Sequence, residues 1–120
     1  AQRDAMIQRW MPSVETYGER SIVCIDGELT HAIRKAPRFH GGAESVSEAL
    51  AIAPDERAFA ERALGSALRE ILYGRVDMVR DESSTLRLME LELVEPSLFL
   101  RQSAPALARF VDAIVRRART

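Results

Sequence analysis

The sequence predicts an α+β domain with a mainly antiparallel sheet and two helices packed on one face of that sheet. Three observations support this fold class. Asp26-Gly27 lies between two strand-like runs, which is a strong hairpin signal. Residues 54–72 carry apolar side chains at helical spacing. A short turn joins two further strand-like runs, 73–80 and 86–94. Hairpin connections favour antiparallel pairing, so the expected order is β-β-β-α-β-β-α.

The first half of the chain should supply three strands and one long loop. Residues 6–10 form a strand-like run that Pro12 closes. Residues 19–26 and 28–34 are the two strands of the Asp-Gly hairpin. Residues 36–53 contain a proline, two glycines and several small polar residues. We therefore predict that they form a loop that is long enough to be functional.

The second half should supply both helices and the last two strands. Pro54 suits the first turn of the helix 54–72. The strands 73–80 and 86–94 follow, and the sequence DESST lies in the turn between them. Ser103 can cap a last helix, whose apolar stripe should pack on the sheet. The stripe consists of Leu107, Phe110, Val111, Ile114 and Val115.

The composition narrows the classes of function. The chain has 120 residues and a net charge of -1, which suits a single domain and argues against a general nucleic-acid binder. No apolar run approaches the roughly 20 residues that a membrane span needs, and no secretory signal is present. Cys24 is the only cysteine, so no internal disulfide can form. These features fit a reducing, cytoplasmic setting.

The strand 86–94 carries two carboxylates on one face. Because side chains alternate along a strand, Glu90 and Glu92 share a face with Leu88, while the opposite Met/Leu face points to the core. Pairing with the strand 73–80 places Asp77 opposite Glu90 and Arg75 opposite Glu92. The same register places Val79 opposite Leu88, Met78 opposite Met89 and Val76 opposite Leu91.

This register gathers Asp77, Glu90 and Glu92 into a cluster, with Arg75 at its edge. Like charges that lie directly opposite each other are destabilising, so such a cluster needs a cation, a shared proton or an arginine. Oxygen ligands favour a hard cation such as Mg²⁺. The alternative is a solvated sheet face on which long side chains keep the charges apart. The residues alone leave both interpretations open.

A basic pair, Arg34-Lys35, ends the second strand of the Asp-Gly hairpin. Adjacent residues on a strand point to opposite faces, so at most one of the two should face the carboxylates. Arginine would bind phosphate through two hydrogen bonds and lysine as a point charge, while ordinary surface residues are the alternative. His31 and His40 have no partner spacing for a zinc site, and His31 is expected on the sheet surface.

Over nearly its whole length the chain resembles the C-terminal half of ATP-grasp ligases, in the branch that includes the cycloserine-forming ligase. The likeness rests on MIQRWMPSVETYGERSIVCIDGELTHAIRKAPRF and on YGRVDMVRDESSTLRLMELELVEPSLFL. The most specific parts are GERS, IDGE, HAIRK and the EP that follows the E-x-E pattern. The resemblance implies the fold of the C-terminal lobe of an ATP-grasp domain.

The resemblance also implies a metal site. In ATP-grasp ligases, an Asp on one strand and an E-x-N on the next bind the Mg²⁺ ions that bridge the ATP phosphates. Asp77 matches that Asp and Glu90 matches the first position of E-x-N. Glu92 takes the place of the Asn, which keeps an oxygen ligand and adds a negative charge. The implied cofactors are therefore ATP and Mg²⁺.

Four further residues receive roles from the resemblance. Arg34, with Lys35 as the second choice, matches the basic position that contacts phosphate or the acyl-phosphate intermediate. Leu88 matches an apolar residue that packs under the adenine. Arg75 precedes the metal-binding Asp and is expected to orient Glu92 or the substrate.

The implied reaction joins a small carboxylate to an amine or a similar nucleophile. The carboxylate attacks the γ-phosphate of ATP, and the nucleophile then displaces phosphate from the acyl phosphate. Residues 1–120 would be one C-terminal ATP-grasp lobe, without the N-terminal substrate domain and the small lobe, and inactive alone. The missing initiator methionine also suggests part of a longer protein, although a complete small domain is the alternative. The second functional hypothesis is a non-catalytic α+β binding or assembly domain, paired with a missing lobe or a second copy.

Overall fold

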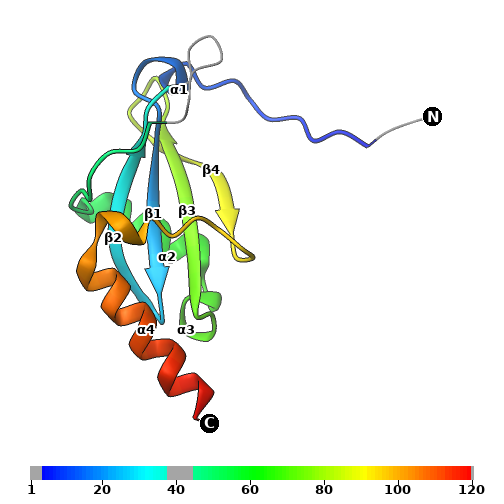
Figure 1. The fold of residues 1–120 in the computed structure, drawn as a ribbon. Helices are drawn as coiled ribbons and strands as arrows, with labels where there is room; N and C mark the ends of the chain where they lie inside the picture. Colours follow the sequence, from blue (N-terminus) through cyan, green and yellow to red (C-terminus); the bar gives the residue numbers. More distant parts are fainter. Residues whose placement is uncertain (1–3, 38–44, 120) are drawn as a thin grey trace.

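A computed structural model describes residues 4–37 and 45–119 of the chain, so His40 and the middle of the predicted loop 36–53 lie outside the described residues. The elements are shown in Figure 1. In chain order they are α1 (Ser13–Thr16), β1 (Glu19–Ile25), β2 (Glu28–Lys35), α2 (Pro54–Leu64), α3 (Ala67–Glu70), β3 (Tyr73–Arg80), β4 (Leu86–Glu92), the 3₁₀ helix η1 (Leu100–Gln102) and α4 (Ala104–Ala118).

The four strands form one antiparallel sheet in the order β2-β1-β3-β4, which confirms the α+β class and the antiparallel pairing. The hairpin turns at Asp26-Gly27, where both residues have a positive φ, at 48° and 79°. This is the backbone conformation that a tight hairpin turn requires and that Asp-Gly favours. Residues 45–53 then run beside β2, where Leu50 N donates to the Ala32 carbonyl at 2.8 Å.

The predicted strand 6–10 is wrong. The segment has no regular structure, and the side chains of Met6 and Ile7 are 94% exposed. A strand is stable only when neighbouring strands satisfy its backbone N–H and C=O groups. Within residues 4–37 and 45–119, no strand is paired with this segment. A short strand-like run before a proline was therefore not enough to form a strand here.

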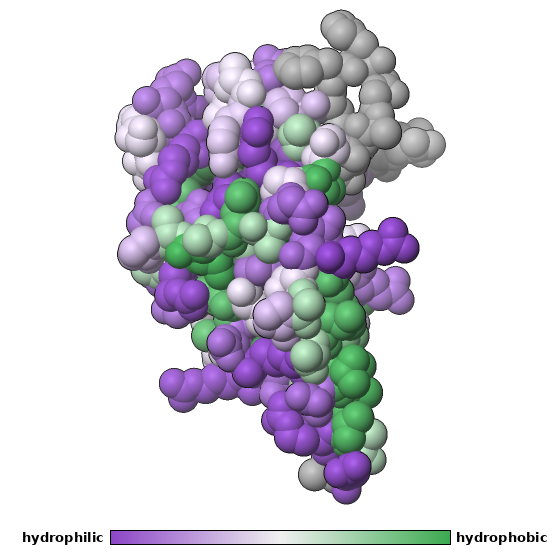
Figure 2. All heavy atoms as spheres, turned by 60° about the vertical axis from the view of Figure 1, so that its left-hand side comes forward, coloured by the Kyte–Doolittle hydropathy of each residue, from purple (hydrophilic) through white to green (hydrophobic). Residues whose placement is uncertain are grey.

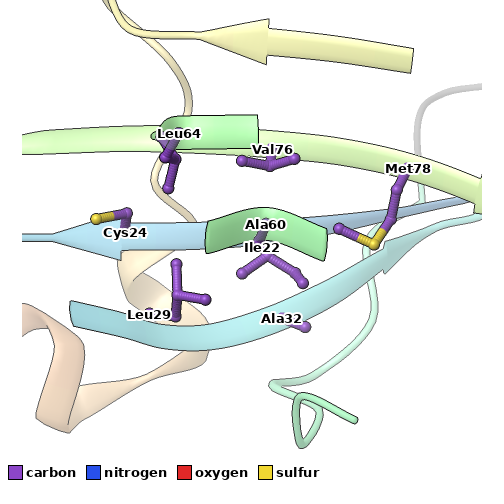
Figure 3. Packing of buried hydrophobic residues seen from close by; sticks show 8 residues of the cluster. All are labelled: Ile22, Cys24, Leu29, Ala32, Ala60, Leu64, Val76 and Met78. Carbon is purple, nitrogen blue, oxygen red and sulfur yellow. The ribbon is translucent and has the colours of Figure 1, made fainter. Parts of the chain in front are cut away.

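The helices cover opposite faces of the sheet, which corrects the prediction that both pack on one face. Ile22 and Cys24 of β1 are buried beneath α2, whereas Val23 and Ile25 are buried beneath α4 and the segment before it. Figure 1 shows α2 and α4 on the two sides of the sheet, and Figure 3 shows Ala60 of α2 over the first face. The run SIVCI is apolar at nearly every position, so both faces of β1 need a cover.

The predicted helix 54–72 is two helices. Pro54 starts α2 as expected, but α2 ends at Leu64 and Gly65 has a positive φ of 54°. The short helix α3 follows, and Ile71 is already extended. Glycine adopts this backbone conformation without the steric cost that a β-carbon would impose, so Gly65 is the point where the helix breaks.

Helix α4 begins at the predicted cap but presents a different face to the sheet. The Ser103 hydroxyl accepts a hydrogen bond from Ala106 N at 3.3 Å, as an N-cap should. Ala106 is buried against Val23 and Ile25 of β1, Ala113 is also buried, and Phe110 is partly buried. The rest of the predicted stripe is exposed, namely Leu107, Val111, Ile114 and Val115.

The exposed side of α4 is visible as a band of apolar atoms along the lower part of the molecule in Figure 2. The buried residues of this helix are two small alanines, Ala106 and Ala113, whereas most of its larger apolar side chains are exposed. The part of the chain that the structure describes contains no helix with the length and hydropathy that a membrane span requires.

Candidate functional site

Strands β3 and β4 pair at the carboxylates as predicted. Asp77 lies opposite Glu90, and Arg75 lies opposite Glu92. Beyond Asp77 the register shifts by one residue, because Met89 is an extra residue in β4. Two predicted cross-strand pairs are affected: Met78–Met89 and Val79–Leu88 are replaced by Met78–Leu88 and Val79–Arg87, whereas Val76–Leu91 is confirmed.

The bulge moves Leu88 away from the carboxylate face. Directly paired residues point to the same side of a sheet, so Leu88 shares a face with Met78. Met78 belongs to the buried cluster beneath α2, on the opposite side from Asp77. The structure therefore does not bring Leu88 together with the carboxylates, which contradicts the predicted common face.

Asp77 is the centre of the site. Its side chain is only 1% exposed, and two cations hold it. Arg75 donates from Nε to Oδ1 at 2.8 Å and from Nη2 to Oδ2 at 2.9 Å, and Lys35 Nζ lies 2.6 Å from Oδ2. Burial alone would raise the pKa of Asp77, but the hydrogen bonds from Arg75 and Lys35 outweigh it and hold the pKa below its ordinary value. Asp77 is therefore an ionised, buried carboxylate.

Arg75 connects all three predicted metal ligands. Besides its two bonds to Asp77, its Nη2 lies 3.3 Å from Glu90 Oε2 and its Nη1 lies 3.0 Å from Glu92 Oε2. The guanidinium also lies 5.7 Å from the centre of the Phe99 ring. Arg75 is thus in the middle of the cluster rather than at its edge, where the sequence placed it.

Lys35, and not Arg34, faces the carboxylates. Glu19 of β1 is paired with Lys35 of β2, and Lys35 Nζ lies 3.0 Å from Glu19 Oε2. Arg34 points to the other face, where its Nε donates to the Tyr17 carbonyl at 2.6 Å and its guanidinium lies over the Tyr17 ring. The sequence interpretation preferred Arg34 and did not include Glu19.

The site contains more negative than positive charge. Glu19, Asp77, Glu90 and Glu92 are joined by ion pairs to two cations of the described chain, Lys35 and Arg75. Burial and the adjacent Glu92 carboxylate raise the pKa of Glu90. At Glu90, therefore, Arg75 does not fully offset burial and the neighbouring negative charge.

An oxygen-only donor set with an excess of negative charge suits Mg²⁺ chemically. Glu90 and Glu92 are accessible, with side chains 52% and 30% exposed. However, both oxygens of Asp77 are held by Arg75 and Lys35. Within residues 4–37 and 45–119, no three acidic, histidine or cysteine side chains are already arranged to hold a metal. A metal ion would therefore need Lys35 or Arg75 to move.

His31 and Cys24 are both buried and lie outside the carboxylate cluster. His31 is buried rather than on the surface, because it faces the side of the sheet that α4 covers; its Nε2 lies 3.2 Å from the Phe99 carbonyl. Burial lowers the pKa of His31, which favours the neutral ring. Cys24 is a buried core thiol, and burial raises its pKa.

Gly18, just before β1, lies against the backbone of Lys35 at the end of β2, where only a glycine fits. Its φ is 93°, and a β-carbon there would lie 2.0 Å from the Lys35 carbonyl oxygen. We predict that Gly18→Ala lowers the free energy of unfolding by about 3 kcal/mol or more, because strain and a backbone clash add. Gly27→Ala is the control, since Gly27 has a φ of 79° but its nearest contact would be 3.5 Å away. Urea denaturation showing equal losses for the two variants would contradict the clash.

Comparison with known proteins finds a related sequence and several similar structures. No family model matches the chain. The cycloserine biosynthesis protein DcsG of Streptomyces lavendulae is 31% identical in an alignment of 124 positions that covers 93% of this chain and 42% of DcsG. The crystal structure of D-cycloserine synthetase DcsG superposes with a TM-score of 0.78 at 32% identity, over 92% of this chain and 41% of that one.

More distant structures share the fold alone. The ATP-grasp ligase PsnB, solved with a minimal precursor, Mg and ADP, has a TM-score of 0.54 at 18% identity, over 79% of this chain and 32% of that chain. The D-alanine–D-alanine ligase of Bacillus anthracis complexed with ATP has a TM-score of 0.53 at 23% identity, over 82% and 36%. The chain spans about two fifths of the length of DcsG.

Proposed function

From the homology of this chain to part of DcsG, and from its structural similarity to ATP-grasp ligases, we propose that its β3–β4 face binds Mg·ATP for an ATP-dependent ligase. The observation that carries the proposal is the cluster of three carboxylates, Asp77, Glu90 and Glu92, around Arg75. This cluster contains more negative than positive charge. The reaction would join a carboxylate to an amine or a similar nucleophile through an acyl phosphate. The chain alone should bind nucleotide weakly and turn over no substrate.

Each residue of the cluster would have a distinct task. Glu90 and Glu92, the more accessible carboxylates, would hold Mg²⁺, and Asp77 would join them once Lys35 has moved. When bound, Mg²⁺ would neutralise phosphate charge and orient the phosphates for transfer. Arg75 would keep the three carboxylates in place, since it already contacts each of them.

Lys35 is the better candidate for the phosphate contact. Its ammonium lies on the carboxylate face, where the phosphates of Mg·ATP would have to be, whereas Arg34 lies on the other face. Burial would lower the pKa of Lys35, but Asp77 and Glu19 outweigh it and raise the pKa, so the side chain stays charged. This assignment replaces Arg34 as the first choice. The position of Leu88 beside Met78 lends no support to a role of Leu88 beneath the adenine.

The two basic residues can be separated experimentally. We expect Lys35→Met to weaken Mg·ATP binding by about tenfold, because a charge-assisted contact to phosphate is lost. The matched variant Arg34→Met should change binding by less than about twofold, since its partner is Tyr17. An NMR titration of each variant with ATP at fixed Mg²⁺ gives both affinities. Equal weakening, or a larger effect of Arg34→Met, would remove Lys35 from the site.

A non-catalytic assembly domain is the second candidate function. The exposed apolar residues of α4, Leu107, Val111, Ile114 and Val115, are the observation that favours it. The two candidates differ in one cheap measurement. An assembly domain should show no ATP binding that depends on a divalent cation, whereas the ligase proposal requires it.

A further inference from the structure

Lys35 lies between two carboxylates of different exposure. Its Nζ is 2.6 Å from Asp77 Oδ2 and 3.0 Å from Glu19 Oε2. The Asp77 side chain is almost fully buried, whereas that of Glu19 is 23% exposed and lies at the start of β1. One ammonium group is therefore shared by an inner and an outer carboxylate.

This arrangement presents a problem for any cation that approaches Asp77. Both Asp77 oxygens accept hydrogen bonds from Arg75, and Oδ2 is also occupied by Lys35. Arg75 is held further by Glu90 and Glu92, so Lys35 is the cation with fewer contacts to lose. An ammonium group that left Asp77 without another partner would be a half-buried, unpaired charge, which is costly.

We propose that Glu19 is a positioning residue that keeps hold of Lys35 when a divalent cation takes its place at Asp77. Glu19 contacts neither Asp77 nor the cation in this scheme and acts only through Lys35. The inference rests on the proposed function, because it assumes that a divalent cation reaches the cluster.

The local backbone supports this assignment. Glu19 and Lys35 are directly paired across the β1–β2 hairpin, so their side chains point to the same face. Gly18, immediately before Glu19, is pressed against the Lys35 carbonyl oxygen so closely that a β-carbon could not be accommodated. The backbones of β1 and β2 are therefore in close contact at Glu19 and Lys35. Lys35 can exchange partners by a movement of its side chain alone.

Binding of Mn²⁺, measured by electron paramagnetic resonance of the free ion, tests the proposal on the 120-residue chain. Mn²⁺ prefers the same oxygen ligands as Mg²⁺. We expect Glu19→Gln to weaken Mn²⁺ binding by about tenfold, because the displaced Lys35 loses a charged partner. The matched control is Glu28→Gln at the other end of the hairpin, where Glu28 pairs with Arg109 at 2.7 Å. It should leave Mn²⁺ affinity unchanged, and Glu19→Asp should restore most of the affinity.

The same substitution in a Lys35→Met background separates positioning from direct attraction between Glu19 and the metal. If Glu19 acts through Lys35, the effect of Glu19→Gln falls below about twofold in that background. A tenfold loss in both backgrounds would mean that Glu19 attracts the ion directly, and no loss in either would leave Glu19 without a role; both results overturn the inference. A parent chain that binds no Mn²⁺, with or without ATP, would overturn the proposed function itself.

Discussion

Replacing Arg75 with methionine should lower the free energy of unfolding by about 3 kcal/mol, the lower end of the cost of breaking a buried ion pair, because Lys35 still pairs with Asp77. Arg75 makes two hydrogen bonds to the buried Asp77 and an ion pair with each of Glu90 and Glu92. Methionine fills a similar volume but compensates none of the three carboxylates. Urea denaturation at pH 7 measures the loss.

The control for this variant is Arg80→Met in the same strand. Arg80 pairs with Asp55 at 2.6 Å, but both side chains are about half exposed. An exposed ion pair of this kind contributes about 0–1 kcal/mol, so the loss should be several times smaller. Equal losses for the two variants would show that Arg75 is not the residue that keeps the carboxylate cluster together.

The pH dependence of the Arg75 effect follows from the sign of the Asp77 shift. The folded-state pKa of Asp77 is depressed, so the stability that its ion pairs contribute is present above its unfolded pKa of about 3.9 and is lost as the pH falls through the folded value. Without Arg75, only Lys35 opposes the effect of burial, so the folded-state pKa of Asp77 should rise and less of this stability should remain. The difference between parent and Arg75→Met should therefore be largest near pH 7 and shrink below about pH 4. A difference that stays constant from pH 7 to pH 3 would assign the loss to packing instead.

Combining Asp77→Asn with Glu90→Gln should remove ATP binding that depends on Mg²⁺. Two of the three proposed ligands lose their charge while the shapes of the side chains are kept. We expect a weakening of more than about tenfold, which is the range that changes around metal sites produce. Calorimetric titration with ATP, with and without Mg²⁺, measures it.

A matched control for the double variant lies at the turn between the same two strands. Asp81→Asn with Glu82→Gln makes the same change in net charge, and Asp81 pairs with Arg87 rather than with the cluster. Binding of Mg·ATP should survive there. If the Asp77 and Glu90 double variant binds Mg·ATP as well as the parent does, the metal site is not at this face.

The carboxylate cluster could be predicted because it depends on local alternation. Two residues of spacing place Glu90 and Glu92 on one face, and only one register of β3 against β4 keeps the apolar residues together. That reasoning paired Asp77 with Glu90 and Arg75 with Glu92 correctly. It failed one residue further on, because Met89 forms a bulge without a glycine or any other local signal, and Leu88 changed faces as a result.

A second irregularity decides which of the two basic residues faces the carboxylates; the preference for Arg34 had come from the family resemblance and not from the strand register. An uninterrupted hairpin with Asp26-Gly27 at its turn would pair Arg34 with Glu19. The register shift between Val23 and Cys24 instead brings Lys35 opposite Glu19. One extra residue in a strand exchanges the faces of all residues beyond it, so an alternation pattern alone cannot decide between two adjacent basic residues.

The errors in predicting which sheet face each helix covers, and which side of α4 is buried, have a different cause. The stripe predicted for α4 was correct as a pattern of spacing, but the helix has alanines on its adjacent side, and Ala106 and Ala113 are its buried residues. Periodicity gives the apolar face of a helix, and steric fit decides which part of that face is covered. The continuous apolar run of β1 was the available sign that both sheet faces are buried.

Paramagnetic broadening of backbone amide resonances by Mn²⁺ in the presence of ATP is the most direct test of the central claim, that the β3–β4 face holds a divalent cation. We expect small amounts of Mn²⁺ to broaden the resonances of Asp77, Glu90 and Glu92 first, to spare Val111 on the exposed side of α4, and to lose this effect when Mg²⁺ is added in excess. Uniform broadening, no broadening, or the same selective broadening in the Asp77→Asn, Glu90→Gln double variant would contradict it.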